Sequence, residues 1–138
     1  MLLRKLAARP LIYVAGPLSQ GVVATNIRTA LLAAEQLWEL GFVPHVPHLT
    51  HFWNFALPHE DTRHEDAFWM QLDFAMLEHC DCMMRLPGPS IGADMEEDKA
   101  QSLGIPIFHD VSEAEAWIGF VCPIGSATAI NLSARNNR

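Results

Sequence analysis

The sequence predicts an α/β fold with a parallel sheet of four or five strands between two layers of helices, as in flavodoxin-like and Rossmann-like three-layer sandwiches. The chain has 138 residues, enough for one domain with one core, and half of its residues are apolar. Short apolar runs alternate with stretches of helical periodicity in the order βαβαβαβα, which favours right-handed crossovers and helices on both faces of the sheet. We expect a single domain over residues 1–138, with its core at about 11–119 and a tail, 120–138, without a clear pattern.

The first half of the chain predicts two strands, one helix and a long loop. The apolar run Leu11–Ala15 is the first strand, and Asn26–Leu40, with apolar residues at helical spacing and a glycine after its end, is the first helix. The second strand is Phe42–Val46, which Pro44 restricts to a sheet edge or a strand start. Residues 47–62 are rich in Pro, His and aromatic residues without periodicity, so we expect a long loop with room for a short helix.

The second half predicts three helices and two strands. Apolar residues at helical spacing predict the helices Glu65–His79 and Ile91–Leu103, and a final short helix covers Ser112–Gly119, with Ser112 as its N-cap and Glu115 as the capping-box partner. The apolar runs between them are the predicted strands Cys80–Leu86 and Ile105–Phe108. Ligands of such sheets bind at the carboxyl ends of the strands, so we expect the site in the loops that follow the first three strands.

Composition and charge argue against several classes of function. The formal net charge is −7 and the nine Lys and Arg residues are scattered, so a DNA or RNA polymer would find no basic stripe. No apolar run approaches the roughly 20 residues of a membrane span. The N-terminus lacks the long apolar stretch and cleavage site of a signal peptide, so we expect a cytoplasmic protein without nucleic-acid or membrane partners. The three cysteines have no CxxC spacing, which disfavours a disulfide framework or a four-cysteine zinc site.

Three histidines, His45, His48 and His51, stand at three-residue intervals in and after the second predicted strand. Pro44 and Pro47 prevent a regular helix there, so the three side chains would not share a face, and no companion Cys or carboxylate spacing completes a ligand set. We therefore expect no metal and no cofactor. Contact between one of these histidines and a ligand is the favoured alternative.

A candidate anion site lies at the start of the helix Ile91–Leu103. Ser90 and the free backbone amides near Gly92 would hold a negatively charged group there. Four carboxylates follow, and they either stabilise the helix start or include one that acts on a ligand: Asp94, Glu96, Glu97 and Asp98. We place Glu96 in the first helical turn and expect the helix dipole to keep it ionised, able to attack an electrophilic carbon.

Two other positions are candidates for chemistry. Gly16 directly follows a buried strand, which lets a ligand approach the backbone closely, although an ordinary strand-to-helix turn explains it equally well. Asp73 lies beside the apolar face of its predicted helix, where an unpartnered carboxyl has a raised pKa that suits proton transfer. The alternative for Asp73 is a residue at the boundary of an amphipathic helix.

Taken in order, these segments resemble the nucleoside 2-deoxyribosyltransferase superfamily over about residues 11–108. The resemblance rests on the segments Tyr13-Val14-Ala15-Gly16-Pro17, Asn26-Ile27, Pro47-His48, Asp73 through Asp81, Ser90-Ile91-Gly92-Ala93-Asp94-Met95-Glu96 and Ala100 through Pro106. It is strongest for a bacterial and phage branch that begins with the Tyr-Val-Ala-Gly-Pro pattern. The 2′-deoxynucleoside 5′-phosphate N-hydrolases are a second similar group.

The resemblance implies roles for individual residues. Glu96 matches the nucleophile that attacks the anomeric carbon and forms a glycosyl-enzyme, Asp73 matches the group that protonates or hydrogen-bonds the leaving base, and Tyr13 matches a tyrosine that orients the nucleophile. The residues expected to contact substrate are Gly16, Pro17, Leu18, His48, Ser90 and Gly92, of which Ser90 and Gly92 match a phosphate-binding turn. The chemistry would parallel that of retaining glycosidases.

The resemblance leaves three functions open. The first is an N-glycosidase that cleaves a nucleoside or a (deoxy)nucleoside 5′-monophosphate, the second is a deoxyribosyltransferase that exchanges bases, and the third is a nucleotide-binding module without catalysis. The hydrolases carry an arginine in their first phosphate loop, whereas residues 18–21 have none, so a 5′-phosphate stays open. A homodimer or larger homo-oligomer is implied, with Ser126, Thr128 or Asn131 as candidates for a residue that a neighbouring subunit supplies.

Overall fold

The computed structural model describes residues 9–59 and 63–122 and confirms the predicted α/β fold. All four strands are parallel and lie in the order β2-β1-β3-β4. Their bounds are β1 Leu11–Ala15, β2 Val43–His45, β3 Cys82–Arg85 and β4 Ile107–Phe108. Pro44 lies in β2, an edge strand, as predicted, because there its missing N–H costs no bond of the sheet.

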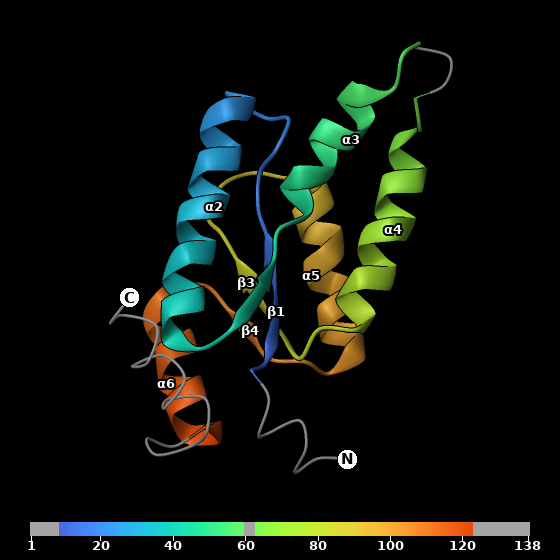
Figure 1. The fold of residues 1–138 in the computed structure, drawn as a ribbon. Helices are drawn as coiled ribbons and strands as arrows, with labels where there is room; N and C mark the ends of the chain where they lie inside the picture. Colours follow the sequence, from blue (N-terminus) through green and yellow to red (C-terminus); the bar gives the residue numbers. More distant parts are fainter. Residues whose placement is uncertain (1–8, 60–62, 123–138) are drawn as a thin grey trace.

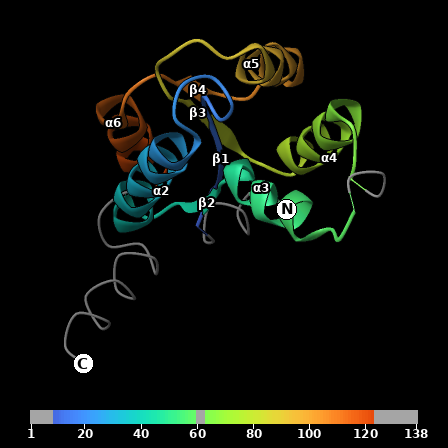
Figure 2. The same ribbon diagram turned by 90° about the horizontal axis from the view of Figure 1, so that it is seen from above.

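Helices cover both faces of the sheet and complete a three-layer sandwich. α2 and α6 lie on one face, and α4 and α5 lie on the other (Figures 1 and 2). The helix bounds are α2 Val23–Leu40, η1 Pro47–Leu49, α3 Thr50–Ala56, α4 Asp66–Glu78, α5 Ile91–Leu103 and α6 Val111–Val121. Among these described segments, no helix is long and apolar enough to cross a membrane.

β1 is buried on both faces, and its side chains alternate between two cores. Ile12 and Val14 pack with α2 and α6, whereas Tyr13 and Ala15 pack on the side of α4 and α5. A strand covered on both faces reads as a continuous apolar run, which explains why it was predictable to the residue. Tyr13 therefore points into the layer that also holds Asp73 and Glu96.

Beyond small shifts in the bounds of other elements, the structure corrects the start of α2, the loop after β2 and the N-cap of α6. α2 begins at Val23, three residues before the predicted start. Most of the predicted loop after β2 is helical, because η1 runs directly into α3. The N-cap of α6 is Asp110 and not Ser112: Asp110 has the extended backbone of a cap and accepts a 2.9 Å hydrogen bond from Glu113 N, while Ser112 already lies inside the helix.

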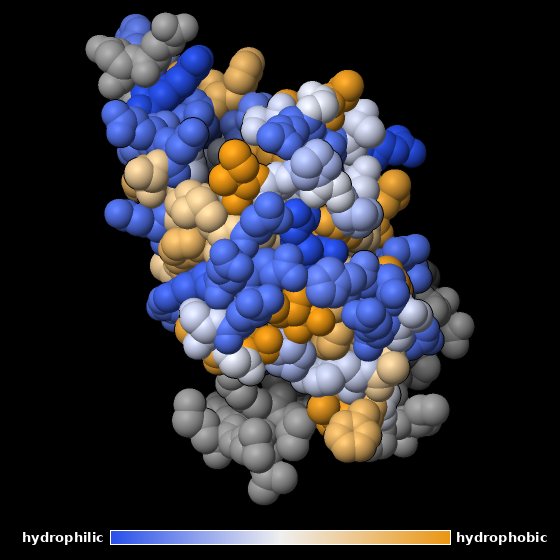
Figure 3. Space-filling model, turned by 180° about the vertical axis from the view of Figure 1, so that it is seen from behind, coloured by the Kyte–Doolittle hydropathy of each residue, from blue (hydrophilic) through white to orange (hydrophobic). Residues whose placement is uncertain are grey.

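Polar side chains dominate the back of the molecule, where apolar side chains form separate small groups (Figure 3). The predicted tail 120–138 begins inside α6, and its residues 123–138, with Ser126, Thr128 and Asn131, lie outside the described residues, as do residues 1–8 and 60–62.

Candidate active site

The loops after β1, β2 and β3 meet at the carboxyl edge of the sheet, as predicted. His48 Nε2 lies 3.0 Å from Pro17 O, which joins the loop after β1 to η1. A Cβ on Gly88 would lie 2.9 Å from Pro17 Cγ, and one on Gly16 would lie 3.0 Å from Leu86 Cβ. The three loops are therefore in direct contact, and glycines stand where two backbones come closest.

Asn26 shapes the loop after β1 from the first turn of α2. Its Nδ2 donates to Leu18 O at 2.9 Å and to Gln20 O at 2.7 Å. The carbonyl of Leu18, a residue predicted to contact substrate, thus already accepts a hydrogen bond from Asn26. The side-chain amide replaces the backbone bonds that an irregular loop lacks, so the loop has a defined shape beside Gly16 and Pro17.

Two carboxyl groups are buried together between α4 and α5. Glu96 is 7 % exposed and Asp73 is 8 % exposed. One helical turn nearer the carboxyl edge, Met70 Sδ lies 3.8 Å from the position of a Cβ on Gly92, so these helix faces are in contact. Asp73 follows Met70 by three residues and Glu96 follows Gly92 by four, which places both carboxyl groups on the facing surfaces.

Burial changes the protonation of this carboxyl pair. Burial raises the pKa of Asp73 to about 6. Burial, and then the charge of Asp73, raise the pKa of Glu96 to about 8, while Tyr13 and the charge of Arg85 act in the opposite direction. At neutral pH the pair therefore holds about one proton, which is the state that acid–base chemistry with two carboxyl groups requires.

The expected ionised Glu96 in the first helical turn is therefore wrong. Ser90 caps α5, so the first turn contains Asp94, and Glu96 lies in the second turn on the buried face. The helix dipole acts mainly on the first turn, and the loss of hydration outweighs it deeper in the protein. The raised pKa predicted for Asp73 is confirmed.

Tyr13 lies beneath the carboxyl pair on β1. Its side chain is fully buried, and burial, followed by the charges of Glu96 and Asp73, raises its pKa far above the usual value. The phenol is close enough to Glu96 to lower the pKa of that carboxyl, but its hydroxyl makes no hydrogen bond of ordinary geometry within the described residues. Tyr13 is thus neutral and able to donate a proton to a hydrogen bond.

Burial distinguishes Glu96 from the three neighbouring carboxylates. Asp94 pairs with Arg85 at 2.7 Å, and Glu97 lies 2.9 Å from His109 and 3.6 Å from Arg85. Asp98 is exposed. Asp94 and Glu97 therefore act as ion-pair partners, and Glu96 alone of the four faces Asp73 and Tyr13.

Several polar atoms beside the pair are buried and make no hydrogen bond in the described part of the chain. They are Tyr13 Oη, His45 Nε2, His48 Nδ1, Asp73 Oδ1 and Glu96 Oε2. Buried polar atoms without partners are rare in folded proteins, so their concentration around one carboxyl edge indicates a ligand site. A ligand rich in hydroxyl or ring nitrogen atoms would match donors and acceptors of this kind.

The histidines do not form a metal site. His45 is in register with Tyr13, with ring centroids 5.5 Å apart, and His48 is buried against Pro17, whereas His51 contacts the aromatic rings of α3. Burial lowers the pKa of both His45 and His48, so they are neutral at pH 7. In residues 9–59 and 63–122 no group of three or more His, Cys, Asp and Glu could hold a metal ion.

Ser90 and Gly92 lie at the start of α5, beside the carboxyl pair. The Ser90 hydroxyl oxygen accepts a 3.1 Å hydrogen bond from Ala93 N, which makes Ser90 the N-cap of α5. Its proton is still free to be donated, so Ser90 and the first amides of the helix would receive an acceptor group of a substrate.

Sequence analysis missed Arg85 and the aromatic residues Trp53 and Trp69 beside the site. Trp53 of α3 packs edge-to-face on Trp69 of α4 with centroids 5.3 Å apart, and Trp69 stands one turn before Asp73. Arg85 lies within the predicted strand Cys80–Leu86, and an arginine in that strand was an available signal, because arginine is seldom buried without a partner. Trp53 gave no such signal.

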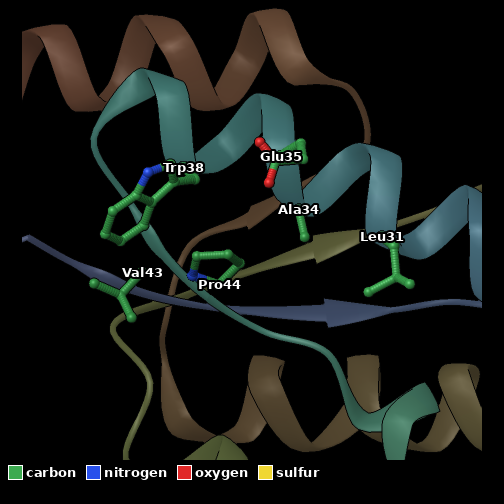
Figure 4. A pocket seen from close by; sticks show the side chains of 6 residues that line it. All are labelled: Leu31, Ala34, Glu35, Trp38, Val43 and Pro44. Carbon is green, nitrogen blue, oxygen red and sulfur yellow. The ribbon is translucent and has the colours of Figure 1, made fainter. Parts of the chain in front are cut away.

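An open groove beside the edge strand β2 is a separate feature (Figure 4). Its walls come from α2 and β2, with Leu31, Ala34, Glu35, Trp38, Val43 and Pro44. It lies on the α2 face of the sheet and contains none of the residues predicted for the site. We therefore assign the candidate site to the layer of α4 and α5.

Replacing Gly88 by alanine is expected to reduce stability by about 1–3 kcal/mol, because its φ of 113° is unfavourable for side chains and the new Cβ would lie 2.9 Å from Pro17 Cγ. Urea unfolding at pH 7 measures this change. Gly119→Ala is the matched control: nothing lies within 4 Å of its Cβ position in α6, so a stabilisation of about 0.5–1 kcal/mol is expected. Equal effects at both positions would contradict the close contact between the loops.

Comparisons with known proteins agree with the fold. The sequence model of the family described as "Domain of unknown function (DUF4406)" matches residues 10–109. A similar solved structure is that of a conserved protein from Enterococcus faecalis V583, with 18 % sequence identity and a TM-score of 0.58, over 93 % of this chain and 88 % of that one. At this identity the likeness concerns the fold alone. No curated protein matches the chain.

Proposed function

The chain belongs to the DUF4406 family, and we propose that it is an N-glycosidase that cleaves the bond between sugar and base in a nucleoside or a (deoxy)nucleoside 5′-monophosphate. The observation that carries this proposal is the buried pair of Glu96 and Asp73, with unpartnered oxygens and Tyr13 beside it. Two carboxyl groups that share one proton are the machinery of retaining glycoside hydrolysis. The resemblance to nucleoside 2-deoxyribosyltransferases supports a nucleoside as the class of substrate.

The proposed first step forms a covalent glycosyl-enzyme. A carboxylate oxygen of Glu96 bonds to the anomeric carbon while the bond from that carbon to the base nitrogen breaks. Asp73 gives its proton to the leaving base, and Tyr13 donates a hydrogen bond that orients Glu96. In the second step water attacks the anomeric carbon, Asp73 takes a proton from this water, and Glu96 leaves as a carboxylate.

Substrate binding has to favour one distribution of the shared proton. Without substrate, burial raises the pKa of both carboxyl groups, so the proton can reside on either of them. An electron-poor anomeric carbon above Glu96 favours its ionised form, and a basic ring nitrogen at Asp73 favours the protonated acid. A bound nucleoside therefore raises the fraction of molecules in which Glu96 is ionised and Asp73 is protonated.

The pH dependence of kcat/KM is expected to be bell-shaped, with limbs near the two pKa values of about 6 and about 8. Below about pH 6 both carboxyl groups are protonated and no nucleophile remains, whereas above about pH 8 both are ionised and no acid remains. Initial rates of base release between pH 4.5 and 10 would check this expectation. A rate that stays constant across this range would contradict a shared proton.

The direct test is incubation with a panel of nucleosides and 5′-monophosphates, with released base followed by chromatography. After rapid denaturation during turnover, the intact mass of the protein should be larger by one sugar residue. Digestion should then place this sugar on the peptide that contains Glu96. Release of base without this adduct would argue against the covalent mechanism. Absence of turnover with every substrate, combined with tight nucleotide binding, would favour the non-catalytic module instead.

Base exchange is the alternative reaction of the same carboxyl pair. A free base would replace water as the acceptor and attack the glycosyl-enzyme. Adding a second, isotopically labelled base to the incubation separates the two, since labelled nucleoside appears only in transfer. The resemblance also supports a homodimer or larger homo-oligomer, which light scattering at micromolar concentration would test.

A further inference from the structure

Arg85, the last residue of β3, has no role in the reaction as described so far. It is the only buried Lys or Arg in residues 9–59 and 63–122. β3 pairs with β1 in parallel, and Arg85 is in register with Ala15, which packs on the side of α4 and α5. Its side chain therefore enters the layer that holds the carboxyl pair.

The guanidinium of Arg85 joins three consecutive parts of the chain. Its NH1 donates to Leu86 O and its NH2 donates to Gly88 O at 3.1 Å, which fixes the turn after β3. NH2 also donates to Asp94 Oδ1 at 2.7 Å, and Nε lies 3.6 Å from Glu97 Oε2. The end of β3, the turn and the first two turns of α5 are thus held by one rigid planar group.

We propose that Arg85 is a positioning residue for the carboxyl pair: it holds the start of α5, the helix of Glu96, against β3 and adds a buried positive charge to the layer of α4 and α5, which favours an ionised Glu96 and a protonated Asp73. The inference rests on the proposed glycosidase function. It explains why Glu96, and not Asp73, is the nucleophile of the pair: Arg85 contacts α5, the helix that carries Glu96.

The titratable and charged groups that act on Glu96 come from three elements. Asp73 on α4 opposes its ionisation, whereas Tyr13 on β1 and Arg85 on β3 favour it, as their effects on the pKa of Glu96 show. Arg85 in turn faces Asp94 and Glu97, and Glu97 contacts His109. Asp94 is 66 % exposed, so solvent weakens its compensation of the guanidinium, while Arg85 and Glu96 are both buried.

The test compares Arg85→Gln, which removes the charge, with Arg85→Lys, which keeps it. We expect the alkaline limb of the kcat profile to move to higher pH in Arg85→Gln. We also expect kcat at its plateau to fall about tenfold for each pH unit of that movement, because the proton then resides more on Glu96. KM should change by less than about threefold. Arg85→Lys should return the limb toward its wild-type position.

Lys99→Gln is the matched control, because it removes a cation from α5, the helix that carries Glu96. Lys99 pairs with Glu78 at 3.0 Å. This substitution should leave both limbs in place. Asp94→Asn tests the inference without touching a buried residue, since it removes an exposed counter-charge of Arg85 and should move the alkaline limb to lower pH. A fall in kcat with unmoved limbs in Arg85→Gln and no recovery in Arg85→Lys would overturn the proposal.

Unfolding measurements separate this inference from the proposed function. If the wild-type protein releases no base, the function fails, but the electrostatic coupling is still measurable. The stabilisation by Glu96→Gln at pH 9 should then be larger in an Arg85→Gln background than in the wild type. Equal stabilisation in both backgrounds would overturn the role of Arg85. If Arg85→Gln does not fold, the same comparison is made with Asp94→Asn, where the stabilisation should be smaller.

Discussion

Glu96→Gln is expected to lower the rate of base release by about 10³-fold or more, since an amide of the same shape fills the site but cannot form the glycosyl-enzyme. Glu96 is buried beside Asp73 and Tyr13, so no exposed carboxylate of α5 could take its place without movement of the helix. Steady-state rates at pH 7 with the best substrate of the panel would measure the loss. The sugar adduct seen by mass spectrometry should disappear with it.

Asp98→Asn is the control for this loss. Asp98 is exposed, lies two residues after Glu96 on the same helix, and is changed from carboxylate to amide in the same way. Its rate should stay within about twofold of the wild type, because exposed charges have weak effects at a distance. Turnover that survives Glu96→Gln would sink the proposed mechanism for every substrate considered above.

Glu96→Gln is also expected to stabilise the fold by about 3–5 kcal/mol at pH 9. Folding raises the pKa of Glu96 from about 4.5 to about 8, so the folded state binds the proton more tightly than the unfolded state. The carboxylate therefore costs no stability below about pH 4.5, and its cost grows as the pH rises toward 8. Glutamine cannot ionise and removes that cost.

Urea unfolding of the wild type and of Glu96→Gln at pH 4.5, 6, 7.5 and 9 measures this difference in free energy. The advantage of the variant should be near zero at pH 4.5 and increase up to about pH 8. Asp98→Asn should show no such trend. A stabilisation that is the same at every pH would mean that packing, and not ionisation, distinguishes the two side chains.

Loss of activity and gain of stability in one variant would have a common cause. A buried carboxylate without a full set of hydrogen bonds is unfavourable for folding and well suited to chemistry, because it has no solvent to lose when a substrate arrives. The unpartnered oxygens of Asp73 and Glu96 and the hydroxyl of Tyr13 have this property together. A cluster of buried polar groups that are unfavourable for folding is expected where the residues were selected for function and not for stability.

The elements that sequence alone determined are those with local signals. β1 was predicted to the residue because an apolar run buried on both faces has no other interpretation, and α5 was predicted to the residue because Ser90 caps its start and Gly104 its end. The convergence of Gly16, Pro17, His48 and Ser90 at one edge followed from the parallel order of the strands. The finer assignment of Glu96 among four carboxylates came from resemblance, not from periodicity.

Tertiary structure alone decided which groups are buried together and how they are protonated. Glu96 was expected to be ionised, yet its burial, and then the charge of Asp73 from a distant part of the chain, raise its pKa. Arg85 was missed for a related reason: its role depends on contacts with the turn after β3 and with α5, which the sequence of its own strand does not contain. Periodicity reports which face of an element is apolar, whereas desolvation and charge depend on what the fold places opposite that face.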